Sequence, residues 1–103
     1  MGAEREPLEK VPCRTPAEGR DGVTNIPKWK FDAVAAAIRT ALMNETDLSF
    51  KELQAQTRAA MKAADIADLG SFGWHFTVVK LELEVRGDIV RAPGGGPQKL
   101  RLA

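Results

Sequence analysis

What this chain can fold into depends most on one segment, residues 76 to 91, which fits two kinds of secondary structure. Apolar and charged residues alternate through "VKLELEVR", and this period of two is typical of a half-buried strand. Other apolar residues of the region repeat at helical spacing: Phe72, Phe76, Val79 and Leu83. A strand over 76–86 would need a partner of similar length, whereas only the short segments 89–91 and 98–102 are available. Strand length therefore favours a helix, although that helix would carry a second apolar stripe on its opposite side: Trp74, Val78, Leu81 and Val85.

Two helices are expected before this segment. The first should begin at Pro27, because proline suits the first position of a helix. Its apolar residues recur at helical spacing: Phe31, Val34, Ala35, Ile38, Ala41 and Leu42. The second helix should begin at Ser49, since Ser49 and Glu52 have the spacing of a capping box, and it should end near Ala64. The following residues, "DIADLGSFG", are expected to be a connection, with Ser71 as the cap of the next helix.

Length and composition restrict the class of protein. The 103 residues, 44% of them hydrophobic, suffice for one compact domain with a modest core. The 15 basic and 14 acidic residues nearly cancel, so any nucleic-acid binding must depend on local charge rather than on an overall positive field. Cys13 is the only cysteine, no apolar run approaches the roughly 20 residues that span a bilayer, and no secretory signal is recognisable. These features favour a cytoplasmic protein with no membrane partner.

Residues 1–25 are expected to form a flexible N-terminal arm, and residues 26–103 the folded domain. The first segment mixes charges of both signs with helix and strand breakers: Pro7, Pro12, Pro16, Gly19 and Gly22. Such a composition buries too little apolar area to offset the loss of chain entropy. Residues 23–26 have some extended character and could lie along the domain.

The C-terminal residues carry a resemblance to a known family. Residues 83–91 read L-E-x-R-G-x-I-x-R and are followed by a glycine-rich turn, "APGGGP", and a basic segment, "KLRL". In these features residues 27–103 resemble the winged helix-turn-helix family, in which the third helix ends on such a glycine and the next strand opens the wing. The chain also looks like small bacterial winged-helix proteins without an assigned role. Together with strand length, the resemblance predicts a helix over 71–86 and a mainly α fold with a small β-hairpin, a three-helix winged helix-turn-helix domain.

The resemblance implies a DNA-binding protein, a small transcriptional regulator whose partner is double-stranded DNA. Family members that bind DNA read the major groove with the third helix and contact phosphates with the wing, here helix 71–86 and wing 89–102. The expected base-contacting residues lie in the first half of that helix: Ser71, Trp74, His75, Thr77 and Val78. The expected phosphate-contacting residues lie in the wing: Arg91, Lys99 and Arg101.

The alternative is a protein–protein interaction or homodimerisation module that does not bind DNA, because a fold does not fix a function. The outer apolar stripe of helix 71–86 would then be the interface. Catalysis is the weakest hypothesis. The chain has one histidine and no metal-spaced cluster, and its "GGG" lies between two expected strands instead of opening a helix, as a nucleotide-binding loop would. We therefore expect no enzyme activity, no cofactor and no metal.

Overall fold

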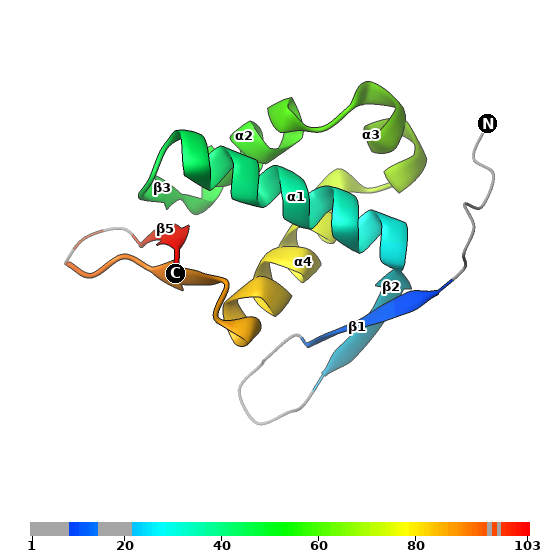
Figure 1. Ribbon diagram of the computed structural model, residues 1–103, viewed down its shortest axis with the longest axis horizontal. Coiled ribbons are helices and arrows are strands. Elements are labelled where there is room, and N and C mark those ends of the chain that lie inside the picture. Colours follow the sequence, from blue (N-terminus) through cyan, green and yellow to red (C-terminus); the bar gives the residue numbers. More distant parts are fainter. Residues whose placement is uncertain (1–8, 15–21, 95, 97) are drawn as a thin grey trace.

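The computed structural model describes residues 9–14, 22–94, 96 and 98–103, and shows a mixed α/β architecture (Figure 1). The helices within these residues are α1 (Lys28–Asn44), α2 (Phe50–Ala60), α3 (Ala63–Leu69) and α4 (Phe72–Arg86). The strands are β1 (Lys10–Arg14), β2 (Val23–Pro27), β3 (Leu48–Ser49), β4 (Ile89–Arg91) and β5 (Lys99–Leu102). β1 and β2 form an antiparallel hairpin, whereas the second sheet has the order β3–β5–β4. α1 crosses the molecule between the two sheets, and α4 packs against it.

The segment that was ambiguous in sequence is helix α4. Its start is capped by Ser71, whose Oγ accepts a hydrogen bond from the backbone N–H of Trp74 (3.3 Å). It ends at Gly87, where φ is 81°; Gly87 N donates to Glu84 O (3.1 Å) and Asp88 N donates to Leu83 O (2.9 Å). This is a Schellman motif, in which a left-handed residue, usually glycine, lets two N–H groups satisfy carbonyls of the last turn. The helix prediction for 71–86 is therefore confirmed, and the strand alternative is wrong.

The expected count of three helices is wrong for the described residues, because α3 occupies part of the predicted connection. α1 begins one residue after Pro27, and α2 has the predicted capping box but ends at Ala60 rather than near Ala64. α3 then runs to Leu69, whose side chain is fully buried, and ends at Gly70 with φ of 89°. Seven residues are too few for the sequence to show a clear helical period. The burial of Leu69, which would have favoured a helix over a loop, depends on tertiary contacts.

Two parts of the expected flexible arm, residues 10–14 and 23–25, belong to the hairpin instead. β1 and β2 are paired in register from Lys10 opposite Pro27 to Arg14 opposite Val23. Residues 1–8 and 15–21 of the expected arm lie outside the described residues. Composition misled here because a hairpin that packs on a helix needs few apolar residues, provided that they point inward. Two such residues, Cys13 and Ile26, are 0% and 1% exposed.

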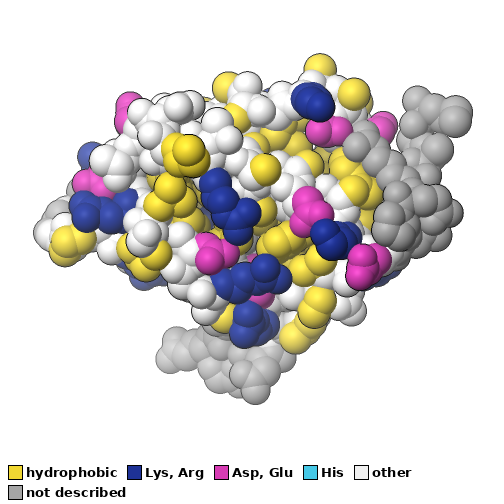
Figure 2. All heavy atoms as spheres, in the orientation of Figure 1, with side chains coloured by type: hydrophobic (Ala, Val, Ile, Leu, Met, Phe, Trp, Pro, Cys, Tyr) yellow, Lys and Arg dark blue, Asp and Glu magenta, His cyan; other side chains and the backbone are white. Residues whose placement is uncertain are grey.

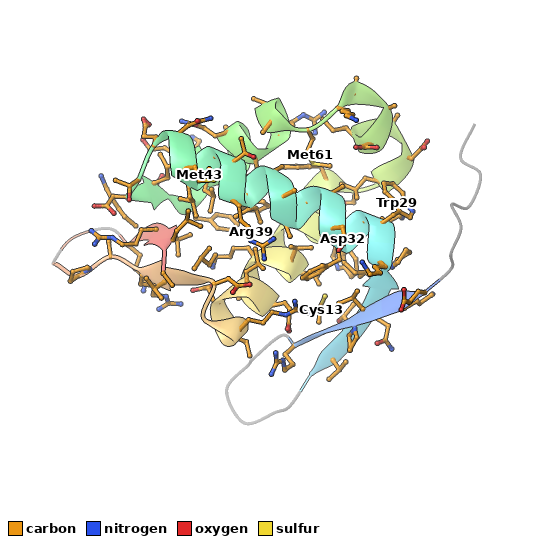
Figure 3. The ribbon with its side chains drawn as sticks, viewed as in Figure 1. Cys13, Trp29, Asp32, Arg39, Met43 and Met61 are labelled. Atoms are coloured by element: carbon orange, nitrogen blue, oxygen red, sulfur yellow. The ribbon has the colours of Figure 1, made fainter. Side chains whose placement is uncertain are left out.

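The hairpin covers part of the face of α4 that was expected to be an exposed apolar stripe. β1 contacts α4, and Figure 3 shows Cys13 pointing from β1 toward the helices. Within the expected stripe, Val78 is buried and Leu81 is half-buried, whereas Trp74 and Val85 remain exposed. Val78 therefore belongs to the core, and the stripe is interrupted at its centre.

The main core lies where α1, α2, α4 and the second sheet meet. Its large, almost fully buried side chains come from every one of these elements: Val34, Ile38, Leu53, Phe76, Val79, Leu83 and Ile89. Phe76 also stacks with Phe72 at a centroid distance of 5.9 Å. This packing fixes α4 against α1 and α2, and so determines which residues of α4 face solvent.

Candidate nucleic-acid interface

A shallow groove lies between α2 and the first turn of α4. It is lined by Lys51, Gln54, Ala55, Arg58, Phe72 and Gly73. On α2, Lys51, Gln54 and Arg58 are three and four residues apart, so they share one face of the helix. On α4, Gly73 faces Gln54, and a Cβ atom at this position would lie 3.4 Å from Nε2 of Gln54, about van der Waals contact. The groove thus lies between one polar face of α2 and the first turn of α4.

The α2 wall of this groove is basic. Lys51 and Arg58 are exposed, and neither forms an ion pair with another described residue. The guanidinium carbon of Arg58 lies 5.4 Å from the centre of the Phe72 ring, a stacking contact that holds the cation at the groove. None of the residues that line the groove is acidic. Such a wall attracts phosphate groups.

α4 exposes only part of the expected base-contacting set. Ser71 is exposed, and Trp74 is 48% exposed. Thr77 is half-buried, and its hydroxyl donates to the backbone carbonyl one turn earlier at 2.9 Å. His75 and Val78 are only 8% and 5% exposed, because both face the interior of the protein. The prediction that these two side chains face a DNA groove is therefore corrected to a structural role.

His75 stabilises the start of α4. Its Nδ1 lies 2.7 Å from the carbonyl oxygen of Ser71, and because a carbonyl only accepts, Nδ1 carries the proton. Burial lowers the pKa of the imidazole and the nearby Lys30 cation lowers it further, while the hydrogen bond to Ser71 acts in the opposite direction. The neutral ring also packs edge-on against Trp74, with ring centres 4.8 Å apart. His75 therefore positions the exposed indole of Trp74.

The second sheet divides the three wing cations between its two faces. Arg91 is the register partner of Leu100, which is buried, so Arg91 lies on the face of the sheet that packs on the helices. Lys99 and Arg101 are the neighbours of Leu100 in β5 and lie on the opposite face, because side chains alternate along a strand. The three residues therefore do not form one surface.

The wing cations also differ in their partners. Arg101 forms a bidentate ion pair with Asp47, at 2.8 and 2.9 Å. Arg91 Nε lies 3.4 Å from Glu84, and the Arg91 side chain remains 57% exposed. Lys99 is exposed and forms no ion pair with another described residue. Of the three, Arg91 is the one that contacts α4, near its C-terminal end.

A short network of contacts connects the start of α2 with β4 through α4. Nζ of Lys80 lies 2.7 Å from Glu84 and 5.4 Å from the centre of the Phe50 ring. The same carboxylate approaches Arg91, so Glu84 lies between two cations. The pairing neutralises the one acidic residue on this side of α4, and it leaves Arg91 next to the helix face that adjoins the groove.

On the opposite side of α4, a buried carboxylate attaches the hairpin. Glu82 is 1% exposed and accepts hydrogen bonds from Arg14: from its backbone N–H (2.7 Å), from Nε (3.1 Å) and from a terminal nitrogen (2.8 Å). Nε of Arg86 donates a further one at 2.7 Å. The hydrogen bonds from Arg14, with a smaller contribution from Arg86, outweigh the effect of burial and lower the pKa of Glu82 to about 2. The hydrogen bonds between Arg14 and Glu82 therefore hold β1 against α4.

Other kinds of site find no support in the described part of the chain. Its His, Cys, Asp and Glu side chains form no group of three or more that could hold a metal ion. None of its helices is both long enough and apolar enough to cross a membrane.

Comparison with known proteins assigns the chain to a family. A family model matches residues 10–100, which include the hairpin, all four helices and the groove. The chain belongs to the DUF6958 family. DUF6958 is a family of unknown function, and the comparison thus gives this chain a family without giving it an activity. Searches of curated proteins and of solved structures each returned no match.

Sequence reasoning missed the α2 wall of the groove in this DUF6958 chain. Sequence analysis did not single out Lys51, Gln54 or Arg58. Their spacing of three and four residues is a visible signal of a shared face, but it does not show which polar face adjoins another helix. Gly73, four residues after the end of α3 and in the first turn of α4, was the second signal, because glycine inside a helix often has a packing reason.

Proposed function

We propose that this protein binds double-stranded DNA and acts as a small transcriptional regulator. In this proposal the exposed face of α4 enters the major groove, which is wide enough for a helix, and the flanking cations contact phosphates. The observation that carries the proposal is the groove between α2 and α4, with Lys51 and Arg58 exposed on one wall and no acidic residue in its lining.

The order of the elements in the second half of the chain supports the same proposal. α4 ends on Gly87 and leads directly into β4, and β4 pairs with β5 around a glycine-rich turn, as expected for a wing that follows a recognition helix. α2 contacts α4, and in the proposed arrangement it would be the helix that precedes the recognition helix. α3 is an additional short helix between them.

The phosphate contacts can be tested with two matched double variants. Lys51→Ala with Arg58→Ala removes two cations from the groove, whereas Lys28→Ala with Arg39→Ala removes two from α1. On that face acidic and basic side chains lie next to one another (Figure 2), and both control cations have carboxylate partners, Asp32 and Asp88. Figure 3 shows that Asp32 and Arg39 project from this side of α1. The control therefore changes the same number of charges at a distance from the groove.

Fluorescence anisotropy with a labelled mixed-sequence duplex should be measured over a range of salt concentrations. Each phosphate contact contributes about 0.9 to the slope of log K against log salt, so the groove variant should lower this slope by roughly two. The α1 variant should leave the slope unchanged. Equal slopes for the two variants, or no binding of wild type at low salt, would contradict the proposal.

Association with another protein chain is the second candidate, because Trp74 and Val85 on α4 are 48% and 40% exposed. In that case sedimentation should show an oligomer that Val85→Asp dissociates, since a charge buried in an apolar interface is costly. The groove variant should then sediment like wild type. A monomer that binds duplex DNA at low salt favours the first candidate.

A further inference from the structure

The solvent-facing surface of α4 beside the groove offers no charged group that is available to read a base. Its members at helical spacing are Gly73, Trp74, Thr77 and Leu81. The cation on this side of α4, Lys80, has a side chain only 13% exposed and is paired with Glu84. Bidentate contact of arginine or lysine with guanine is the most common specific contact in the major groove. α4 itself therefore lacks the usual means of selecting a G·C pair, and the cations that line the groove, Lys51 and Arg58, belong to α2.

The same surface is suited to contact with methyl groups. The indole of Trp74 is half-exposed and packs edge-on against the buried His75 ring. The hydroxyl of Thr77 is engaged with a backbone carbonyl, so its methyl group is the part left for a ligand. In the major groove the complementary apolar group is the C5 methyl of thymine.

A polar group for the partner base lies across the groove. Gln54 is half-buried beside Gly73, and its side-chain amide makes no hydrogen bond to another described residue. A glutamine amide can pair in bidentate fashion with N6 and N7 of adenine. The groove thus places an adenine-type donor and acceptor next to a thymine-type apolar surface.

We propose that this surface selects A·T base pairs in the major groove, with Trp74 and Thr77 contacting thymine methyl groups and Gln54 contacting adenine. The inference rests on the proposed function, and it adds the class of sequence that is recognised. Sequence-independent attraction comes from Lys51, Arg58 and Arg91, whereas discrimination comes from these three uncharged side chains.

Thymine-to-uracil substitution tests the methyl contacts directly, because dU differs from dT only by the C5 methyl group in the major groove. The probe is a short A·T-rich duplex, compared with the same duplex in which dU replaces dT and with a G·C-rich duplex of equal length. Wild type should bind the dU duplex about fourfold more weakly for each methyl group that it contacts, the ratio expected for one buried CH₂ group. It should bind the G·C-rich duplex more weakly still.

The variants assign the effect to residues. Thr77→Ser keeps the hydroxyl and removes only the methyl group, and Trp74→Ala removes the indole; each should reduce the dT-to-dU ratio, while Gln54→Ala should reduce the preference for A·T over G·C. Val85→Ala removes another exposed apolar side chain of α4 and should leave both ratios unchanged. Circular dichroism confirms that each variant is folded, and Thr77→Ser keeps the test informative if Trp74→Ala is not.

The possible results separate the inference from the proposed function. Salt-dependent binding with equal affinity for the dT and dU duplexes would overturn the A·T inference and leave DNA binding intact. A preference for the G·C-rich duplex would also overturn it. Failure to bind any duplex at low salt would overturn both, and an oligomer that Val85→Asp dissociates would then identify the face as a protein interface.

Discussion

Replacing Glu82 by Gln tests whether a buried carboxylate holds the N-terminal hairpin on α4. Hydrogen bonds from Arg14, aided by Arg86, lower the pKa of Glu82 from its ordinary 4.5 to about 2. One pKa unit corresponds to about 1.4 kcal/mol, so the charged form adds about 3 kcal/mol to the free energy of unfolding at neutral pH. The side chains of Arg14 and Arg86 are 54% and 39% exposed, and water will solvate them in the variant. We therefore expect a smaller loss, about 2 kcal/mol.

The pH dependence of the free energy of unfolding shows whether Glu82 stabilises the protein through its charge or through the packing of its side chain. Because the pKa is lower in the folded than in the unfolded protein, the stabilisation is fully present above the unfolded value and is lost as pH falls from about 4.5 toward 2. Urea denaturation should show wild type losing its advantage over Glu82→Gln within this range. At neutral pH the free energy of unfolding of wild type should exceed that of Glu82→Gln by the full expected difference.

An exposed carboxylate serves as the control. Asp32→Asn removes a charge from a surface pair with Lys28 and should change the free energy of unfolding little, because surface ion pairs contribute little. Two results would refute the reasoning: Glu82→Gln as stable as wild type at neutral pH, or a difference in stability that stays constant through the acid range. The second would show that the amide perturbs packing and that the carboxylate charge contributes nothing.

The parts of this fold that sequence predicted well are those set by neighbouring residues. Ser49 with Glu52, and Gly87 after a run of helix formers, determine helix ends through hydrogen bonds that close within one turn. The α1 stripe and the hairpin of β4 and β5 are equally local. For α4, the lack of a partner strand of similar length and the resemblance to winged helix-turn-helix proteins decided for a helix against an alternating pattern that favoured a strand.

The β1–β2 hairpin could not be predicted in the same way, because its stability comes from contacts distant in sequence. Arg14 and Glu82 are 68 residues apart, and neither residue alone indicates a strand or a buried charge. One clue was present in the predicted helix, since Val78 lay on a face that nothing covered. An apolar residue on the outer face of a predicted helix suggests that another element packs on that face. Here β1 of the hairpin packs on α4.

The candidate site likewise combines features that the sequence predicted with features that depend on tertiary packing. Helical periodicity predicted that Trp74 and Val78 would share the outer side of α4, but Trp74 is 48% exposed and Val78 only 5%. Burial of His75 likewise depends on how α4 is rotated against its neighbours. Positions on a helix follow from sequence, whereas the direction that a face points follows from packing.

Three further predictions concern single residues. Gly87→Ala should lower the free energy of unfolding by about 1 to 2 kcal/mol, measured by urea denaturation, because φ of 81° is strained for any residue with a Cβ atom. Ser49→Ala should cost about 1 kcal/mol in the same assay by removing the N-cap oxygen of α2, and Ser49→Asp, which keeps an acceptor, should recover most of it. Cys13 reports on opening of the hairpin, because its side chain is buried and burial, reinforced by Glu82, raises the pKa of the thiol to about 11. Reaction with a thiol reagent at mildly alkaline pH should thus be slow in the native protein and rapid in urea. Since reaction requires the hairpin to open, Glu82→Gln should accelerate the native reaction by up to about thirtyfold, the factor that corresponds to about 2 kcal/mol. A native rate equal to the rate in urea would show that the hairpin does not protect Cys13, and an unchanged rate in Glu82→Gln would show that Glu82 does not hold the hairpin closed.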